Sequence, residues 1–306
     1  MGNDKLKNGI NRCNLTGSHK TQYNHRVEAT RFVDQLRENG LGVQKWENIT
    51  NKHVASVVDA WRDKGLTDKT IKEYLSGVRS VANVYDNNRI SQNNADFGLQ
   101  STSVNSTSTT DKSANEDNFK DAISKMESSN KVEEQKIAVQ MQYMRYLGLR
   151  AEEARKLDAI NAERVTAPDG QKYLHIQDGT KGGKERFVPI NDKAQAALDR
   201  GAALQRKTGS KNLMNKNMTE RQYSAMIYRT AQKYGLTRAN SCNFHSLRHS
   251  FAQDLFREKS GGYNAPIKGN QQIPDKNYEA GCRAVEKALG HNTDRADIRG
   301  TYIGSK

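Results

Sequence analysis

The amino-acid sequence predicts a mainly α fold with a small antiparallel β-sheet, an α+β chain divided into two domains. Three observations lead to this prediction. Apolar residues recur at helical spacing through most of the chain, the period falls to two in only two short runs, and a polar stretch separates two periodic blocks. With 306 residues, the chain is long enough for each block to bury a core of its own.

Residues 21–86 are predicted to form a small helical domain of three or four short helices. The first apolar run stops at Asn39-Gly40, which is a helix-ending signal. The second run follows Thr50, and the third follows Thr67, whose hydroxyl suits the N-cap position. A generic bundle would show the same pattern, but the basic residues in this block favour a face that grips DNA. The four expected to contact DNA are Lys52, Lys69, Lys72 and Arg79.

Two stretches are predicted to lie outside the cores. Residues 1–20 are polar and basic without apolar periodicity, so we expect a flexible basic tail. Residues 87–117 are dominated by Asn, Ser, Thr, Gln and Asp, a composition that buries little apolar surface. This second stretch is therefore expected to be a polar linker between the domains.

Residues 118–306 are predicted to form the second domain, in which helices surround a hairpin. Residues 172–176 and 186–190 alternate as strands do, and the glycines between them permit a tight loop. Residues 259–277, rich in Gly, Asn, Gln and Lys, are expected to form a surface loop. Helical patterns occupy residues 137–147, 151–157, 192–204, 220–234, 246–258 and 279–289, and a short helical or turn segment carries Tyr302.

The charge balance points to a polyanionic partner. The chain has 49 Lys and Arg against 35 Asp and Glu, a formal net charge of +14. Nucleic acid is the commonest partner of so basic a surface, although a generally basic protein has the same composition. In the second domain, Lys184 and Arg186 are the cations expected to contact DNA.

The cysteines and the hydropathy exclude several classes of protein. Cys13, Cys242 and Cys282 are odd in number and far apart, which disfavours a disulfide framework and a zinc ribbon. No apolar run of about 18 residues or signal-peptide pattern is present. We therefore expect a cytoplasmic protein that needs no membrane, metal or other cofactor.

The segment from Asn243 to Ser250 has the highest concentration of side chains that could bind or react with a phosphate. His245 and Arg248 stand three residues apart, so on a helix they share a face and suit a phosphate. An isolated pair of this kind is more often a capping histidine and a surface arginine. His245 and His249 have the spacing of zinc ligands, but the glutamate of a zinc-protease helix is replaced by Ser246.

Four further residues are weak signals when taken singly. Arg150 begins a helix with Glu153 one turn on, a pair that is usually a structural ion pair. Lys181 lies at the tip of the hairpin, His291 follows a helix-ending glycine, and Tyr302 stands near the terminus. Each has an ordinary structural explanation, and only the set is specific.

In order and local sequence the set resembles the tyrosine recombinase (phage integrase) family. The motifs are Gly148-Leu149-Arg150-x-x-Glu153, Thr180-Lys181-Gly182-Gly183-Lys184-x-Arg186, His245-x-Leu247-Arg248-His249, Leu289-Gly290-His291 and Tyr302. The resemblance covers the second domain, and residues 21–86 are similar to the family's helical core-binding domain. Five ordered motifs make agreement by chance improbable.

The resemblance implies a role for each position. Arg150 and Arg248 would clamp the scissile phosphate, with Glu153 orienting Arg150. His245 and His291 would donate hydrogen bonds or handle protons, Lys181 would be the general acid, and Tyr302 the nucleophile. Fixed guanidiniums can oppose the negative charge of phosphoryl transfer without a metal.

The implied function is that of a site-specific recombinase, an enzyme that cuts and rejoins DNA through a covalent 3'-phosphotyrosine. It would integrate or excise a mobile genetic element. The implied partners are double-stranded DNA with specific recombination sites, three further copies in a homotetramer on synapsed DNA, and accessory DNA-bending or directionality factors. The alternatives are a resolvase-like or topoisomerase-like enzyme of the same chemistry, and a catalytically inactive DNA-binding architectural or regulatory protein.

Overall fold

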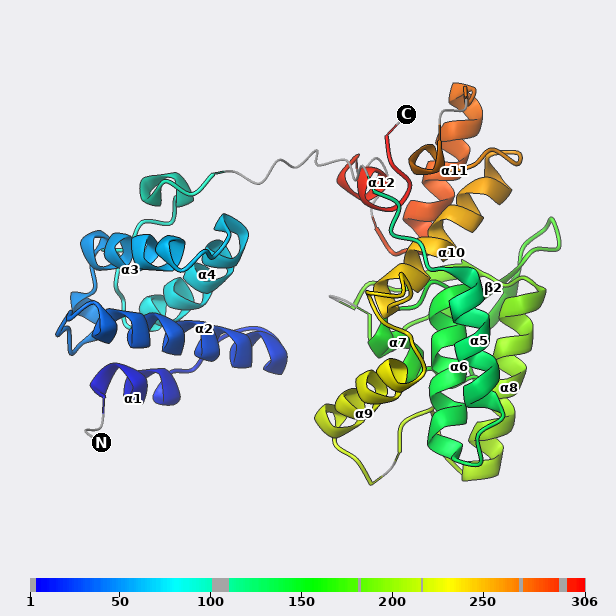
Figure 1. The fold of residues 1–306 in the computed structure, drawn as a ribbon, viewed down its shortest axis with the longest axis horizontal. Helices are drawn as coiled ribbons and strands as arrows, with labels where there is room; N and C mark the ends of the chain where they lie inside the picture. The colour runs from blue at the N-terminus through cyan, green and yellow to red at the C-terminus, as the bar shows by residue number, and fades with distance from the viewer. Residues whose placement is uncertain are drawn as a thin grey trace. The chain divides into compact units, whose positions relative to one another are not determined.

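In the computed structural model, the described residues form two separate hydrophobic cores. One core belongs to the unit Met1–Ser103 and the other to the unit Val104–Lys306 (Figure 1). The structure describes residues 4–100, 110–180, 183–215, 217–269, 272–291 and 296–305. The mainly helical fold with a small antiparallel sheet is confirmed.

All the secondary-structure elements in the described part of the first unit are helices. Thr67 caps α4 by accepting a hydrogen bond from the Thr70 amide, as the sequence predicts. Gly40 has a φ of +72°, the left-handed conformation that ends α2. The Phe32 ring contacts both Trp46 and Trp61 in the core. The elements are α1 (Lys5–Arg12), α2 (His19–Glu38), η1 (Trp46–Asn48), α3 (Asn51–Asp63), α4 (Asp68–Val84) and η2 (Asn94–Phe97).

The described part of the expected N-terminal tail is a packed helix instead. Asp4 caps α1, and Leu6 and Ile10 are buried one turn apart on its inner face. The indole Nε1 of Trp46 donates to the Leu6 carbonyl oxygen at 3.0 Å, which ties α1 to the core. Figure 1 shows α1 alongside α2. Although α1 is mostly polar, Leu6 and Ile10 are enough to pack it against the core, because Trp46 provides a surface for it.

The expected linker also contributes to the cores at both of its ends. Ile90, Phe97 and Leu99 are buried in the first unit, and the Asn87 side chain donates to the carbonyl oxygens of two residues near η1. At the other end, Ala114 packs against the core of the second unit, and the Asn115 amide donates to the Ser241 carbonyl oxygen at 2.8 Å. Composition averaged over the stretch hides these few apolar anchors.

The second unit surrounds its core with helices and a three-stranded antiparallel sheet, in the order β1-β2-β3. Leu174 of β2 pairs with Arg164 of β1 and Val188 of β3. The two predicted strands are confirmed, and β1 is an additional edge strand. The elements are α5 (Glu116–Glu127), α6 (Val132–Tyr146), α7 (Ala151–Lys156), β1 (Arg164–Thr166), β2 (Lys172–Ile176), β3 (Arg186–Pro189), α8 (Asp192–Thr208), α9 (Glu220–Lys233), α10 (Phe244–Lys259), η4 (Pro266–Lys268), α11 (Asp275–Ala288) and α12 (Ala296–Tyr302).

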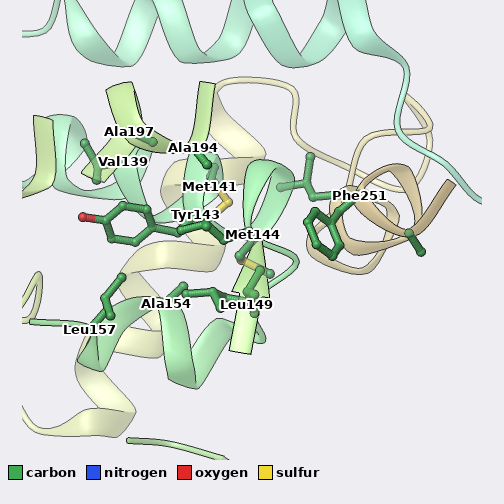
Figure 2. Close-up of a cluster of buried hydrophobic side chains, with 14 of the residues drawn as sticks. Val139, Met141, Tyr143, Met144, Leu149, Ala154, Leu157, Ala194, Ala197 and Phe251 are labelled. Carbon is green, nitrogen blue, oxygen red and sulfur yellow. The ribbon is translucent and has the colours of Figure 1, made fainter. Parts of the chain in front are cut away.

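Helix α6 is the centre of this unit and is buried on nearly all sides. It packs against α5, α8 and α10 (Figure 1). Figure 2 shows Tyr143 of α6 beside Val139 and Ala197. Because α6 is enclosed, its C-terminal end is fixed in position. The turn that follows it, and Arg150 at the start of α7, are therefore fixed as well.

Candidate active site

Five predicted site residues meet where the start of α7, the first turns of α10, the end of α11 and the end of α12 come together. Arg150 is the N-cap residue of α7, and His245 and Arg248 lie on the first turns of α10. His291 follows α11, and Tyr302 is the last residue of α12. The side chain of Asn243 caps α10 by accepting from the amides of His245 and Ser246, so α10 begins at the motif itself.

Arg248 is the buried centre of the site. Its Nε donates to the Tyr302 hydroxyl at 3.3 Å and its Nη2 donates to the Leu289 carbonyl oxygen at 2.8 Å. Its Nη1 donates to the Gly148 carbonyl oxygen. Burial lowers the pKa of Arg248 to about 10, so it remains a cation at neutral pH. The guanidinium is therefore held by two backbone carbonyl oxygens and bonded to the phenol.

The backbone conformation of Gly148 orients its carbonyl oxygen toward Arg248. It has a φ of +60°, and a Cβ at this position would lie 2.2 Å from Cδ1 of Phe251 on α10. A side chain is excluded by both the backbone conformation and the packing. The glycine lets the turn after α6 approach α10 closely enough for Arg248 to reach it.

Arg150 is oriented by Glu153, which is 1% exposed. Arg150 Nη1 donates to Glu153 Oε1 at 2.8 Å, and its backbone amide donates to Oε2 at 2.6 Å. Arg186 Nη1 and Nη2 donate to the same two oxygens at 2.8 and 2.6 Å. Burial alone would raise the pKa of Glu153, but the hydrogen bonds from Arg186 and Arg150 lower it to about 2. Each carboxylate oxygen thus accepts two bonds and the group stays ionised.

The C-terminal end of α11 gathers three arginines. The Leu289 carbonyl oxygen accepts from Arg248 Nη2 and also from Arg150 Nη2, at 3.4 Å. The Ala288 carbonyl oxygen accepts from Arg186 Nε at 2.8 Å. The last carbonyls of a helix have no partner within it and carry partial negative charge. This helix end therefore holds the guanidiniums close together against their mutual repulsion.

Three imidazole rings surround the Tyr302 ring. The ring centroids of His249, His245 and His291 lie 4.6, 6.0 and 6.5 Å from that of Tyr302. Burial lowers the pKa of His249 to about 4, helped by His245 and Lys112, so His249 is neutral at neutral pH. Loss of surrounding water also lowers the pKa of His245, and Arg248 adds to this shift. The sequence placed His249 in a motif and at metal-ligand spacing from His245, but assigned it no role in the reaction. Its packing against the phenol depends on where α12 lies.

Contacts on both sides of Tyr302 hold it in place. One turn before it, Arg299 donates to Glu286 at 2.8 Å and to Glu279 at 3.0 Å, both on α11. Directly after it, Ile303 is buried and its carbonyl oxygen accepts from the Ile267 amide of η4 at 2.9 Å. The predicted surface loop thus supplies an anchor for the end of α12.

The remaining predicted cations fall into three groups. Lys181 lies outside the residues that the structure describes. Lys52, Lys69 and Lys184 are exposed. Lys72 donates to the Gln100 carbonyl oxygen and Arg79 to the Ser91 carbonyl oxygen, both in their own unit. Burial lowers the pKa of Arg79.

Arg186 corrects the sequence-based interpretation. It was expected at a DNA-binding surface, but its side chain is buried against Glu153. A strand alternates its faces, and β3 turns Arg186 inward while Phe187 is exposed. Arg186 therefore holds the Glu153 carboxylate that orients Arg150.

The described residues contain neither a cluster suited to a metal ion nor a helix suited to a membrane. No cluster of three His, Cys, Asp or Glu is arranged there to bind a metal ion. None of the helices described combines the length and the apolar character of a membrane span.

Two family models match the chain. The model described as "Integrase" matches residues 101–254, and the one described as "Phage integrase, N-terminal" matches residues 4–90. No curated protein sequence matches the chain.

The fold is similar to that of several solved structures. XerH site-specific recombinase bound to a palindromic difH substrate, in a post-cleavage complex, has a TM-score of 0.59 at 20% identity, over 93% of this chain and 76% of that one. The Tn1549 transposon integrase in complex with transposon right-end DNA has a TM-score of 0.55 at 16% identity, over 99% and 95%. A lambda integrase dimer bound to a core site has a TM-score of 0.51 at 19% identity, over 93% and 89%.

Proposed function

Because this chain belongs to the integrase family of tyrosine recombinases, we propose that its arginine clamp and Tyr302 cut and rejoin DNA at specific recombination sites. The observation that supports this most directly is the bond from Arg248 Nε to the Tyr302 hydroxyl at 3.3 Å. A phenol has a pKa of about 10 in water and is a poor nucleophile when protonated. A buried cation beside its oxygen favours the phenolate that must form as the attack proceeds.

The proposed reaction exchanges one phosphoester bond for another. Tyr302 Oη forms a bond to the scissile phosphorus and the bond from phosphorus to the 5'-oxygen breaks, leaving a 3'-phosphotyrosine. Lys181 gives a proton to the departing 5'-oxygen, and His245 or His291 takes the phenol proton. The reverse reaction with a new 5'-hydroxyl joins the strands. The intermediate conserves a phosphodiester bond, so joining requires no nucleotide.

Arg150 and Arg248 are the proposed clamp for the non-bridging oxygens. Negative charge builds up on these oxygens during phosphoryl transfer, and prearranged guanidiniums stabilise it without reorganising. The arrangement of Arg150, Glu153 and Arg186 fixes the first guanidinium, and two backbone carbonyls fix the second. Donors that are held before the substrate arrives are what this type of catalysis needs.

The proposed substrate is double-stranded DNA of a mobile genetic element that the enzyme integrates or excises. The net charge of +14 suits a long polyanion. Lys52, Lys69 and Lys184 are exposed cations, and the phosphates of DNA attract such cations. Assembly of four copies on two paired sites, with accessory DNA-bending or directionality factors, belongs to the same proposal. The buried, reduced cysteines suit the cytoplasm, where the DNA would be met.

The competing functions make different predictions. A regulatory DNA-binding protein would have no reason to keep a phenol bonded to a buried arginine, which favours an enzyme. A resolvase-like or topoisomerase-like enzyme would use the same site on a single DNA molecule. A joining assay with two separate duplexes distinguishes it from an integrase, which gives products that contain a strand from each.

The test is covalent trapping on a nicked duplex. The duplex carries the sequence that the chain selects from a pool of random duplexes, with a nick beside the cleavage point so that the released fragment diffuses away. Wild type should form a protease-sensitive DNA adduct. Tyr302→Phe should bind the duplex equally well and form none.

A matched variant, Tyr228→Phe, removes a hydroxyl from an exposed tyrosine on α9 and should form the adduct at the wild-type rate. An adduct in Tyr302→Phe would disprove the assignment of the nucleophile. The absence of any adduct with wild type would refute the proposed activity.

A further inference from the structure

We propose that Asp111 is a positioning residue for Tyr302 that acts through Gln253. This inference rests on the proposed function, because it concerns how the nucleophile is presented. Asp111 lies just before α5 in a stretch that the sequence predicted to be linker, and Gln253 lies on α10 one turn after His249. Neither residue belongs to the motifs from which the site was predicted.

Gln253 connects Asp111 to the backbone of the nucleophile. Its side chain is 4% exposed, and its Nε2 donates to Asp111 Oδ1 at 2.8 Å. The same nitrogen lies 3.5 Å from the carbonyl oxygen of Tyr302. Among the described residues, Gln253 Oε1 has no hydrogen-bond partner, so the bond to Asp111 is what orients the amide. Without that bond, a rotation of the amide would present its oxygen to the Tyr302 carbonyl oxygen.

Asp111 is itself held against α10. Its carboxylate accepts from the backbone amide and the hydroxyl of Ser113, both at 2.9 Å. The next amide, that of Ala114, donates to the Ser250 hydroxyl at 2.8 Å. Ser250 and Gln253 stand three residues apart and share a face of α10. The segment 111–114 is thus fixed along the same helix that carries Arg248.

A second connection runs from Asp111 to the residue after the nucleophile. Asp111 Oδ2 lies 3.7 Å from Lys268 Nζ at the end of η4. The amide of Ile267 in η4 donates to the carbonyl oxygen of Ile303 at 2.9 Å. Asp111 therefore contacts both elements that bind the carbonyl oxygens at the end of α12. The ion pair is partly exposed, so the bond to Gln253 is the stronger of the two connections.

The position of these bonds explains why they matter for the reaction. The last carbonyls of a helix have no partner within it, so the end of α12 is held by whatever its surroundings donate. The Tyr302 hydroxyl must stay close to Arg248 Nε and in line with the scissile bond. A displacement of about 1 Å in a reacting group can reduce a rate by about 100-fold. Loss of Asp111 should therefore affect the chemical step and leave DNA binding intact.

The test compares Asp111→Ala and Asp111→Asn with Asp121→Ala, which removes an exposed carboxylate from a surface ion pair on α5. The same nicked duplex is used at saturating concentration, and the single-turnover rate of adduct formation and the Kd are measured separately. Asp111→Ala should reduce the rate about tenfold or more with a Kd within about twofold of wild type. Asp111→Asn retains an oxygen that accepts from Gln253 and should keep most of the rate. Asp121→Ala should match wild type in both.

A double-mutant cycle tests the connection through Gln253. Gln253→Leu should reduce the rate as much as Asp111→Ala, and the double variant should lose no more than either single one. Hydrogen exchange of peptides within 296–305 provides a readout without DNA, and exchange should be faster in Asp111→Ala than in Asp121→Ala.

The outcomes separate the two proposals. If wild type forms no adduct, the proposed function fails and this inference with it. If wild type forms the adduct and Asp111→Ala reacts at the rate of Asp121→Ala, only the positioning role of Asp111 is disproved. A loss confined to Kd, or a loss in Asp111→Asn equal to that in Asp111→Ala, would equally overturn it.

Discussion

Arg186 and Glu153 form a bidentate ion pair inside the second unit, with N–O distances of 2.8 and 2.6 Å and both side chains buried. The same carboxylate orients Arg150. The pair therefore connects strand β3 to the proposed phosphate clamp. Arg186, which the sequence assigned to DNA binding, instead holds the carboxylate that orients Arg150.

Removing Arg186 should destabilise the second unit strongly. Arg186→Ala leaves the buried Glu153 carboxylate without two of its four hydrogen-bond donors, and breaking a buried ion pair typically costs about 3–5 kcal/mol. Urea unfolding followed by far-UV circular dichroism should show this loss. Lys184→Ala, two residues away and exposed, should change the free energy of unfolding by less than about 0.5 kcal/mol.

The tryptophans provide an internal control for that experiment. Trp46 and Trp61, both tryptophans of the chain, lie in the core of the first unit. Their fluorescence midpoint in urea should be the same in Arg186→Ala and wild type. An unchanged circular-dichroism transition in Arg186→Ala would show that the ion pair contributes little to stability.

Acid should destabilise the second unit through Glu153. Its pKa is about 2 in the folded chain and near 4.5 when unfolded, so the unfolded state binds more protons between these values. The stabilisation is fully present above about pH 5 and is lost as the pH falls toward 2. Glu153→Gln should show a shallower decline of the free energy of unfolding between pH 5 and 3 than wild type. Equal slopes in the two proteins would contradict this prediction.

His249 should cause a second pH dependence at higher pH. Its pKa is about 4 in the folded chain and about 6.5 when unfolded, so folding favours the neutral imidazole. Its contribution to stability is present above about pH 6.5 and declines as the pH falls toward 4. His249→Asn should remove this part of the decline. NMR titration of the imidazole Cε1–H signal that is lost in His249→Asn should give a midpoint near 4, and a midpoint near 6.5 would contradict burial of the neutral ring.

Gly148→Ala should damage both stability and the proposed reaction. The added Cβ would lie 2.2 Å from Phe251, and the shift needed to relieve this contact moves the carbonyl that accepts from Arg248. Overpacking costs about 1–3 kcal/mol, and the left-handed backbone adds about 1 kcal/mol. We expect urea unfolding to show the sum and the rate of adduct formation to fall.

Gly209→Ala is the matched control for Gly148→Ala. Gly209 has nearly the same φ, +59°, but nothing lies within 4 Å of a Cβ added there. It should show the cost of backbone strain alone and react at the wild-type rate. If both variants lost stability equally, packing against Phe251 would not be the reason for glycine at position 148.

Much of the local structure could be predicted from the sequence. Helical periodicity and the caps at Thr67 and Gly40 depend on residues within one or two turns, so a single stretch contains the information. The alternation in β2 and β3 is equally local. Helix α1 was missed because its two apolar residues indicate a helix only once Trp46 covers them.

The positions of the proposed site residues were also predicted from the sequence, through ordered motifs, but of their partners only Glu153, which orients Arg150, was predicted. The bonds that shape the site join residues far apart in the chain: Arg186 to Glu153, Arg248 to the Gly148 carbonyl, and Gln253 to Asp111. No short pattern records such a pair, because each partner is an ordinary residue in its own segment.

The sequence by itself determined the fold class, the basic character and the identity of the residues proposed to react, because these depend on composition, periodicity and local motifs. The tertiary structure decided which cations are buried, which donor each carbonyl receives and what surrounds Tyr302. The physical reason is that the strength of a charge or a hydrogen bond depends on burial and on distance, and both are set only when distant segments pack together.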